Sequence, residues 1–229
     1  MGIVGNRIFK DFERPSKELV ELFRDIPSSN INDEMCRLYC MHDYIHPLNE
    51  MPLLGTAFTV KTAIGDNLFI HEALDLAKPG DVLVIDAGSG NNRSLAGEIM
   101  LTLAYKKGLA GVVVDGCLRD LDGIRKLPMA VYAKGITPQG PFKNGPGEIN
   151  VPVSCGGQVV FPGDILVGDQ DGIVVIRPQD AEKIAQAALK RKQGEDKTFE
   201  LMKNDFDAYL KKHRENTEKM KSGKEITVF

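Results

Sequence analysis

The pattern of apolar and polar positions divides the chain into an α/β first part and a β-rich second part. Residues 53–63 (LLGTAFTVKTA) are rich in β-branched side chains and predict a strand, and residues 66–77 (DNLFIHEALDLA) predict a helix. The apolar run of residues 81–86 predicts the next strand. A strand is also expected at residues 129–133, followed by short β-like segments separated by Gly and Pro up to Ile176.

Helices are expected at both ends of the chain. Ser16 precedes an apolar stripe of helical spacing that ends before Pro27, and a second short helix is expected near Ser29. From Pro178 onward the composition becomes strongly charged, which favours one or more partly solvated C-terminal helices. We therefore expect a main domain over residues 1–177 and a helical extension over residues 178–229.

One short segment occurs twice. PGDVLVID at residues 79–86 returns as PGDILVGD at residues 162–169, with six identities in eight positions. Both copies predict a turn followed by a strand. Because no other self-similarity surrounds them, we interpret the pair as a repeated local structure and not as a repeat fold.

The most informative spacing joins Glu98 to the adjacent pair Arg119-Asp120. Between them, residues 98–107 have helical composition up to Gly108, and residues 110–115 form an apolar run typical of a strand buried on both faces. Ten helical residues span about 15 Å, and five or six extended residues return about 17–20 Å. The acid and the Arg-Asp pair are therefore expected at one edge of the sheet, where α/β proteins bind ligands.

These three side chains suit carboxylate and metal chemistry. The planar, permanently charged fork of Arg119 suits a carboxylate, and Asp120 offers a hard oxygen ligand for Mg²⁺ or Mn²⁺. Glu98 is placed to hold a metal-bound water or to relay a proton. Without the spacing, an adjacent Arg-Asp would be interpreted as a surface ion pair.

A glycine-containing segment, residues 86–93 (DAGSGNNR), is predicted to be a loop that leads from a strand into the helix beginning near Glu98. The amides of residues 97–100 at the start of that helix could hold a carboxylate or phosphate. The segment matches neither the dinucleotide-binding nor the P-loop pattern, so a tight strand-to-helix turn remains the alternative interpretation.

The composition describes an ordinary soluble protein. Charged residues make up 27% of the 229 residues, hydrophobic residues 42%, and the net charge is −3, which gives no bias toward nucleic acid. No apolar run approaches the roughly 20 residues that span a bilayer, and the N-terminus lacks the signal-peptide pattern. We expect a cytoplasmic protein with four reduced cysteines and no membrane partner.

Other candidate groups are less convincing. The segment holding Cys36, Cys40, His42 and His46 has zinc-binding atoms, but the spacing leaves little loop to close a tetrahedron. His71 lies within a predicted helix and is interpreted as a helix histidine rather than a base. Cys117 follows a buried strand and is interpreted as a small buried thiol rather than a nucleophile.

Around Glu98 and the Arg119-Asp120 pair, the sequence resembles a known family. The run GEIMLTLAYKKGLAGVVVDGCLRD, with residues 66–86 before it and PMAVYAKGITPQGP after it, is similar to the RraA-like family, which includes the 4-hydroxy-4-methyl-2-oxoglutarate aldolases. The resemblance covers roughly residues 30–178. It implies a layered α/β/β/α sandwich similar to the swivelling phosphohistidine domains, with a C-terminal helical extension, assembled as a trimer or hexamer.

The resemblance also implies roles for individual residues. Gly97, Glu98, Ile99 and Met100 match the loop whose amides hold the pyruvate carboxylate, and Arg119 matches the arginine that contacts the substrate. Asp120 matches the direct ligand of Mg²⁺ or Mn²⁺. Glu98 matches an acid that reaches the metal through water, where the family usually has Asp. Glu195 falls near an acid that a C-terminal helix of an adjacent subunit supplies, again through water.

The implied activity is a class II aldolase that cleaves 4-hydroxy-2-oxo acids to pyruvate, with oxaloacetate decarboxylation through the same pyruvate enolate. The main alternative is a protein inhibitor of ribonuclease E without catalysis, but such relatives typically lack the aspartate that stands here at 120. A methyltransferase would need an S-adenosylmethionine site, and a phosphotransfer module would need a histidine on a suitable turn. None of the four histidines is so placed: His42, His46, His71 and His213.

Overall fold

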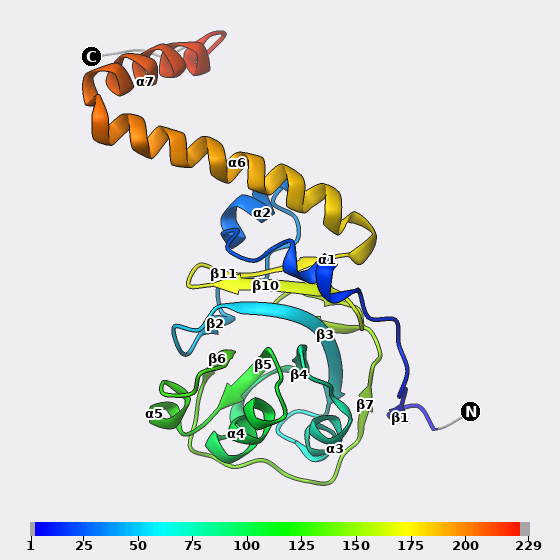
Figure 1. Ribbon diagram of the computed structural model, residues 1–229. Coiled ribbons are helices and arrows are strands. Elements are labelled where there is room, and N and C mark those ends of the chain that lie inside the picture. Colours follow the sequence, from blue (N-terminus) through cyan, green and yellow to red (C-terminus); the bar gives the residue numbers. More distant parts are fainter. Residues whose placement is uncertain (1–2, 225–229) are drawn as a thin grey trace. The chain divides into compact units, whose positions relative to one another are not determined.

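A computed structural model describes residues 3–224 of the chain (Figure 1). The chain divides into two compact units, Met1–Ala188 and Leu189–Phe229. The first unit is a mixed α/β domain that contains the sheet and the elements around it. The second unit is helical and is described separately below.

Four parallel strands form the centre of the first unit. They lie side by side in the order of the chain, and three helices that follow them cover one face (Figure 1). The strands are β3 (Leu53–Thr62), β4 (Asp81–Ser94), β5 (Gly111–Leu118) and β6 (Ala130–Ile136), and the helices are α3 (Leu68–Leu76), α4 (Glu98–Lys106) and α5 (Leu121–Ile124). The predicted strand-helix alternation is confirmed, and every residue of β5 is buried as a central strand requires.

A second β layer packs on the opposite face. β3 pairs with β10 near its start and with β7 near its end, so one strand joins the central sheet to the β-rich second half. The remaining strands confirm the prediction of short β segments up to Ile176: β1 (Asn6–Ile8), β2 (His46–Pro47), β7 (Gly147–Ile149), β8 (Val153–Cys155), β9 (Gln158–Val160), β10 (Ile165–Asp169) and β11 (Gly172–Ile176).

Three buried apolar clusters separate the layers. One lies between α3, α4 and the central sheet, and a second lies between that sheet and β8 to β11. The third joins β10 and β11 to α1 (Lys17–Glu21), α2 (Ser28–Glu34) and the start of α6 (Pro178–Asn204). The order of layers is therefore α/β/β/α, as expected. Ser16 caps α1 by accepting a hydrogen bond from the Leu19 amide at 3.2 Å, also as expected.

The second unit consists of the last part of α6 and of α7 (Phe206–Lys221). Asp205 caps α7 because its side chain accepts a hydrogen bond from the Ala208 amide at 2.9 Å. No residue of α7 is buried within the described chain. The expected charged helical extension is confirmed, and α6 begins at Pro178, where the composition changes.

The predicted glycine loop at residues 86–93 is wrong. β4 continues through it to Ser94, with register shifts on β5 between Asp86 and Gly90 and again between Gly90 and Ser94. This irregular extension requires glycine at position 90, because a Cβ there would lie 2.7 Å from the Ile64 side chain. The helix α4 therefore follows a bulged strand and not a phosphate-type loop.

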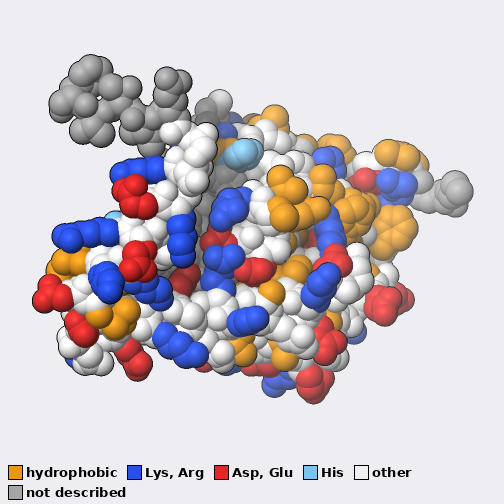
Figure 2. All heavy atoms as spheres, turned by 90° about the horizontal axis from the view of Figure 1, so that it is seen from above, with side chains coloured by type: hydrophobic (Ala, Val, Ile, Leu, Met, Phe, Trp, Pro, Cys, Tyr) orange, Lys and Arg blue, Asp and Glu red, His pale blue; other side chains and the backbone are white. Residues whose placement is uncertain are grey.

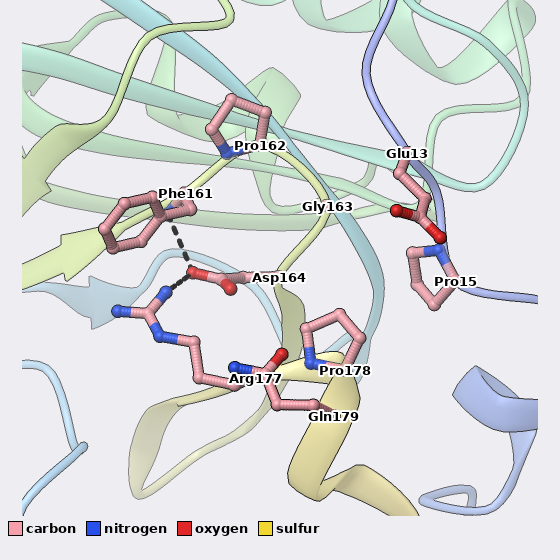
Figure 3. A pocket seen from close by; sticks show the side chains of 9 residues that line it. All are labelled: Glu13, Pro15, Phe161, Pro162, Gly163, Asp164, Arg177, Pro178 and Gln179. Carbon is pink, nitrogen blue, oxygen red and sulfur yellow. Dashed lines mark hydrogen bonds and ion pairs between the residues drawn. The ribbon is translucent and has the colours of Figure 1, made fainter.

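The repeated PGD segments form the same turn twice. The Asp81 carboxylate accepts a hydrogen bond from the Lys78 amide at 2.8 Å, and the Asp164 carboxylate accepts one from the Phe161 amide at 2.7 Å. Both aspartates are buried, and each pairs with an arginine: Arg14 with Asp81, and Arg177 with Asp164 (Figure 3). The interpretation as a repeated local structure is confirmed.

The surface shows no large area of one charge sign on the face drawn in Figure 2, where Lys and Arg side chains are interspersed with Asp and Glu. Among residues 3–224, no helix combines the length and the apolar character needed to cross a bilayer.

Candidate active site

The segment before α4 and the end of β5 lie side by side at the carboxyl edge of the sheet. The Leu95 amide donates to the Cys117 carbonyl at 2.9 Å, and the Arg119 amide donates to the Ala96 carbonyl at 3.1 Å. These two hydrogen bonds continue the pairing of β4 with β5 beyond the strands themselves. The helix α4 and the strand β5 thus bring the chain back to the same edge of the sheet, as the spacing predicted.

Asp120 contacts the first residue of α4 directly. Its Oδ2 accepts a hydrogen bond from the Glu98 amide at 3.0 Å, which places a carboxylate on the N-terminus of the helix. Gly97 makes this approach possible. A Cβ at position 97 would lie 2.3 Å from Asp120 Oδ2 and 2.9 Å from Arg119 Cγ. Only glycine fits where these two side chains cross the backbone.

Arg119 and Asp120 form an open pair. Arg119 Nε lies 3.7 Å from Asp120 Oδ2, beyond hydrogen-bond distance, and the two side chains are 45% and 44% exposed. Asp120 has a left-handed backbone with φ of 65°, which is uncommon outside glycine and typical of turns and functional sites. Each side chain therefore keeps hydrogen-bonding capacity that an external ligand can use.

Glu98 turns its side chain toward α5. A Cβ added at Gly123 would lie 2.3 Å from Glu98 Oε2, so the carboxylate occupies the space above this glycine. Ile99, the next residue, is 87% exposed, while Met100 is half-buried. The Glu98 carboxylate therefore lies beside α5, while Ile99 and Met100 line the space in front of Arg119.

A cavity of about 210 Å³ lies at this edge. It is smaller than the roughly 300–1,000 Å³ of pockets for drug-sized ligands, which suits a small acid. Of the residues predicted from the sequence, it brings together Gly97, Ile99, Met100, Arg119 and Asp120, and Glu98 borders it through its amide. Six residues that were not predicted as site residues also line it: Asn67, His71, Leu95, Ala96, Pro141 and Lys143.

Asn67 is the most informative of these additional residues. It is 2% exposed, and its Nδ2 donates to the Leu95 carbonyl at 2.9 Å. Its Oδ1 has no hydrogen-bond partner within the described part of the chain. A buried acceptor without a partner is costly unless a ligand or water satisfies it. The position could have been found, because Asn67 starts the helix after β3 and so lies at the same sheet edge.

The donor set at the site fits a magnesium-type ion more than a transition metal. Within residues 3–224, no three His, Cys, Asp or Glu side chains gather to hold an ion. Mg²⁺ needs fewer protein ligands, because it keeps several waters and accepts one or two carboxylates together with substrate oxygens. Asp120 could supply such a carboxylate. Glu195 lies in the second unit, so its predicted role in an adjacent subunit stays a prediction.

The cysteine-containing candidate groups do not form sites within residues 3–224. Cys36, Cys40, His42 and His46 do not gather as metal ligands within the part of the chain that the structure describes. Cys117 is buried, and burial raises the pKa of its thiol. A thiol with a raised pKa is a poor nucleophile, in agreement with the interpretation as a buried thiol.

Comparison with known proteins identifies relatives of the chain. The profile of the RraA-like family, described as Aldolase/RraA, matches residues 28–175. A protein of Halalkalibacterium halodurans named "Putative 4-hydroxy-4-methyl-2-oxoglutarate aldolase" is 41% identical over 200 residues, covering 85% of this chain and 95% of that protein. The Thermus thermophilus protein named "4-hydroxy-4-methyl-2-oxoglutarate aldolase" is 37% identical over 111 residues, covering 48% of this chain and 68% of that protein.

A solved structure is also similar to this chain. A Streptomyces coelicolor protein, titled an unusual member of the RNase ES inhibitor RraA protein family, superimposes with a TM-score of 0.74 at 29% identity. The match covers 81% of this chain and 98% of that protein. Proteins similar to this chain thus include both named aldolases and a named member of an inhibitor family.

Proposed function

Since the chain belongs to the RraA-like family, whose named relatives support a lyase, we propose that it is a divalent-metal-dependent aldolase acting on 4-hydroxy-2-oxo acids. The observation that carries the proposal is the open pair of Arg119 and Asp120 at the edge of a small cavity. A permanently charged fork and a half-exposed carboxylate together suit a 2-oxo acid and the cation that accompanies it.

The 2-oxo acid end of the substrate binds at the start of α4. The amides of Ile99 and Met100 lie in the first turn of the helix, where amides have no intrahelical acceptor. They hold the carboxylate with help from the positive end of the helix dipole. Arg119 donates to the keto oxygen, so negative charge that develops on this oxygen during cleavage meets a fixed donor.

We assign the ion site to Asp120, with Mg²⁺ or Mn²⁺ as the ion and Glu98 as a contact through water. When bound, the ion supplies Lewis-acid polarisation of the 2-oxo group. Gly97 allows the Asp120 carboxylate to approach the helix start, so the ion-binding oxygen and the carboxylate-binding amides lie on one small surface.

Cleavage breaks the bond between C3 and C4 of the substrate. The C4 hydroxyl loses its proton, for which we assign Glu98 through an intervening water as the acceptor, and C4 becomes a carbonyl carbon. The bonding electrons pass to C3 and give a pyruvate enolate, which takes up a proton at C3 to become pyruvate. Oxaloacetate decarboxylation reaches the same enolate by loss of carbon dioxide, so one site serves both reactions.

The distal part of the substrate faces Lys143 and His71, which line the same cavity. An ammonium group suits a second carboxylate, and Asn67, which also lines the cavity, has a side-chain oxygen without a hydrogen-bond partner among the described residues. We infer that the preferred substrates are dicarboxylic 4-hydroxy-2-oxo acids. We also propose that the protein works as a homotrimer or homohexamer in which Glu195 of a neighbouring copy contacts the water shell of the ion.

The test is metal-dependent release of pyruvate, coupled to lactate dehydrogenase, from 4-hydroxy-4-methyl-2-oxoglutarate and from oxaloacetate. Asp120→Asn keeps the size of the side chain but removes its charge, and is expected to abolish turnover. Asp122→Asn is the matched control, because the Asp122 side chain is 95% exposed and lies two residues away on α5. Pyruvate release by wild type no faster than by the metal alone would contradict the proposal.

The same experiment separates the proposal from a binding-protein function of the kind named for the Streptomyces coelicolor relative. A binding protein without catalysis would give equal background rates for wild type, Asp120→Asn and Asp122→Asn. The aldolase proposal requires that only Asp120→Asn falls to background.

A further inference from the structure

Arg93 lies beside the candidate active site without lining its cavity. It comes from the irregular end of β4, one residue before the pairing of Ser94 with Cys117. The sequence placed Arg93 at the end of a supposed anion-binding loop. In the structure its guanidinium instead contacts a separate segment of the chain, residues 139–143 (QGPFK), which we call the Gln139–Lys143 loop.

Two contacts join Arg93 to this loop. Arg93 Nη1 donates to the Gly140 carbonyl at 2.7 Å, and the guanidinium carbon lies 3.9 Å from the centre of the Phe142 ring. The contacts fall on both sides of Pro141, which lines the cavity. A planar guanidinium can donate in its plane and stack through its face at once, which the ammonium of lysine cannot do.

The stem of Arg93 is itself held in place. It crosses Gly65, where an added Cβ would lie 2.7 Å from Arg93 Cδ, and Gly65 has a positive φ of 72°. The carbonyl of Gly65 accepts a hydrogen bond from the Phe142 amide at 2.8 Å. Gly65 therefore permits the close passage of the Arg93 side chain and ties down the loop that this side chain contacts.

The Gln139–Lys143 loop also lies close to Arg119. A Cβ at Gly140 would lie 3.2 Å from Arg119 Nη1, so the Gly140 backbone packs close to the guanidinium of Arg119. Lys143, at the end of the loop, lines the cavity. The loop thus borders Arg119, which the proposed function assigns to the keto oxygen, and carries Lys143, which it assigns to the distal carboxylate.

We propose that Arg93 is a positioning residue that clamps the Gln139–Lys143 loop over Arg119. It thereby sets the positions of two charged side chains, Arg119 and Lys143, around the substrate. The assignment to substrate rests on the proposed function, while the clamp itself is a property of the fold. A misplacement of about 1 Å at a reacting group can cost roughly a hundredfold in rate. Loss of the clamp is therefore expected to lower kcat/KM by about ten- to a hundredfold, with the larger part in KM.

The experiment compares Arg93→Ala, Arg93→Lys and Phe142→Leu with Arg125→Ala. Arg125 is the exposed residue that directly follows α5 and serves as the charge control. Hydrogen exchange of the amide of residue 142, which donates to the Gly65 carbonyl, is measured with kcat and KM for pyruvate release. We expect faster exchange and a raised KM in Arg93→Ala, the same direction but smaller in Arg93→Lys and Phe142→Leu, and no change in Arg125→Ala. Added guanidinium chloride at low concentration should partly restore the KM of Arg93→Ala.

Two results would overturn the proposal. One is unchanged exchange of the amide of residue 142 in Arg93→Ala, Arg93→Lys and Phe142→Leu. The other is faster exchange with KM and kcat within twofold of wild type, since the clamp would then not act on the site. Hydrogen exchange needs no turnover, so absence of pyruvate release in wild type would count against the proposed function and leave the clamp to be judged by exchange. If Arg93→Ala fails to fold, Phe142→Leu carries both readouts.

Discussion

The molecule uses arginine and aspartate together in two different ways. In the PGD turns, Arg14 with Asp81 and Arg177 with Asp164 are closed pairs, with the aspartate side chains 1% and 2% exposed. At the sheet edge, Arg119 and Asp120 are an open pair, each nearly half exposed and 3.7 Å apart. The same two residue types thus stabilise the fold in one place and leave their charges available in another.

The difference lies in how many protein partners each carboxylate has. Asp81 receives two hydrogen bonds from Arg14, each of 2.9 Å, and a third from the Lys78 amide. Both arginines of the closed pairs also stack on a phenylalanine, Arg14 on Phe12 at 4.0 Å and Arg177 on Phe161 at 4.4 Å. Asp81 is thus held by its protein partners, whereas Asp120 accepts one hydrogen bond from the described residues, that of the Glu98 amide, and keeps acceptor capacity for a ligand.

The largest expected effect is on stability at a closed pair. Asp81→Ala leaves Arg14 without its buried partner, which should lower the free energy of unfolding by about 3 kcal/mol. Asp120→Ala removes a half-exposed side chain and its hydrogen bond from the Glu98 amide, and should lower it by only about 1 kcal/mol. Urea unfolding followed by circular dichroism measures both. Equal losses in the two variants would remove the distinction between closed and open pairs.

The next largest effect is on catalysis at Gly97. In Gly97→Ala the new methyl group would lie 2.3 Å from Asp120 Oδ2, so Asp120 and Arg119 must move. We expect a loss of roughly a hundredfold in kcat/KM for pyruvate release. Gly135→Ala is the control, because its Cβ would lie 3.4 Å from Cys117 Sγ, an ordinary contact. Full activity in Gly97→Ala would mean that the close crossing is not needed.

The smallest effect is a pH dependence at a third closed pair, Arg7 with Glu148, which links β1 and β7. The hydrogen bond from Arg7 lowers the pKa of Glu148 below its usual value of about 4.3. Because the folded-state pKa is depressed, the stabilisation is present above pH about 4.3 and is lost as the pH falls through the folded-state pKa. Glu148→Gln should thus cost most stability near pH 7 and progressively less below pH 4. A cost independent of pH between 7 and 3 would show that the charge of Glu148 does not matter.

Much of the site could be predicted because it depends on local structure. Gly108 ends a run of helix formers and residues 110–114 are apolar, so the helix and strand between Glu98 and Arg119 follow from composition and length alone. The PGD turns were predictable for the same reason, since the aspartate accepts a hydrogen bond from an amide only three residues before it.

The rest depends on contacts between distant segments. The irregular pairing of Gly90 with Gly116 turns a predicted loop into strand, and no local signal reports a partner on another strand. Lys143 reaches the cavity because the Gln139–Lys143 loop folds back over the sheet edge, held by Arg93 and Gly65. The contribution of Lys143 to the site is therefore a tertiary property.

The central claim is that the open pair stabilises a pyruvate enolate, and solvent exchange at the methyl group of pyruvate tests it most directly. The wild-type protein with Mg²⁺ in deuterium oxide is expected to replace the methyl protons of pyruvate with deuterium, followed by proton NMR, while Asp120→Asn should not exceed the rate of Mg²⁺ alone. This measurement does not depend on the identity of the full substrate. Exchange by wild type no faster than by Mg²⁺ alone, or equal exchange by Asp120→Asn, would contradict the account.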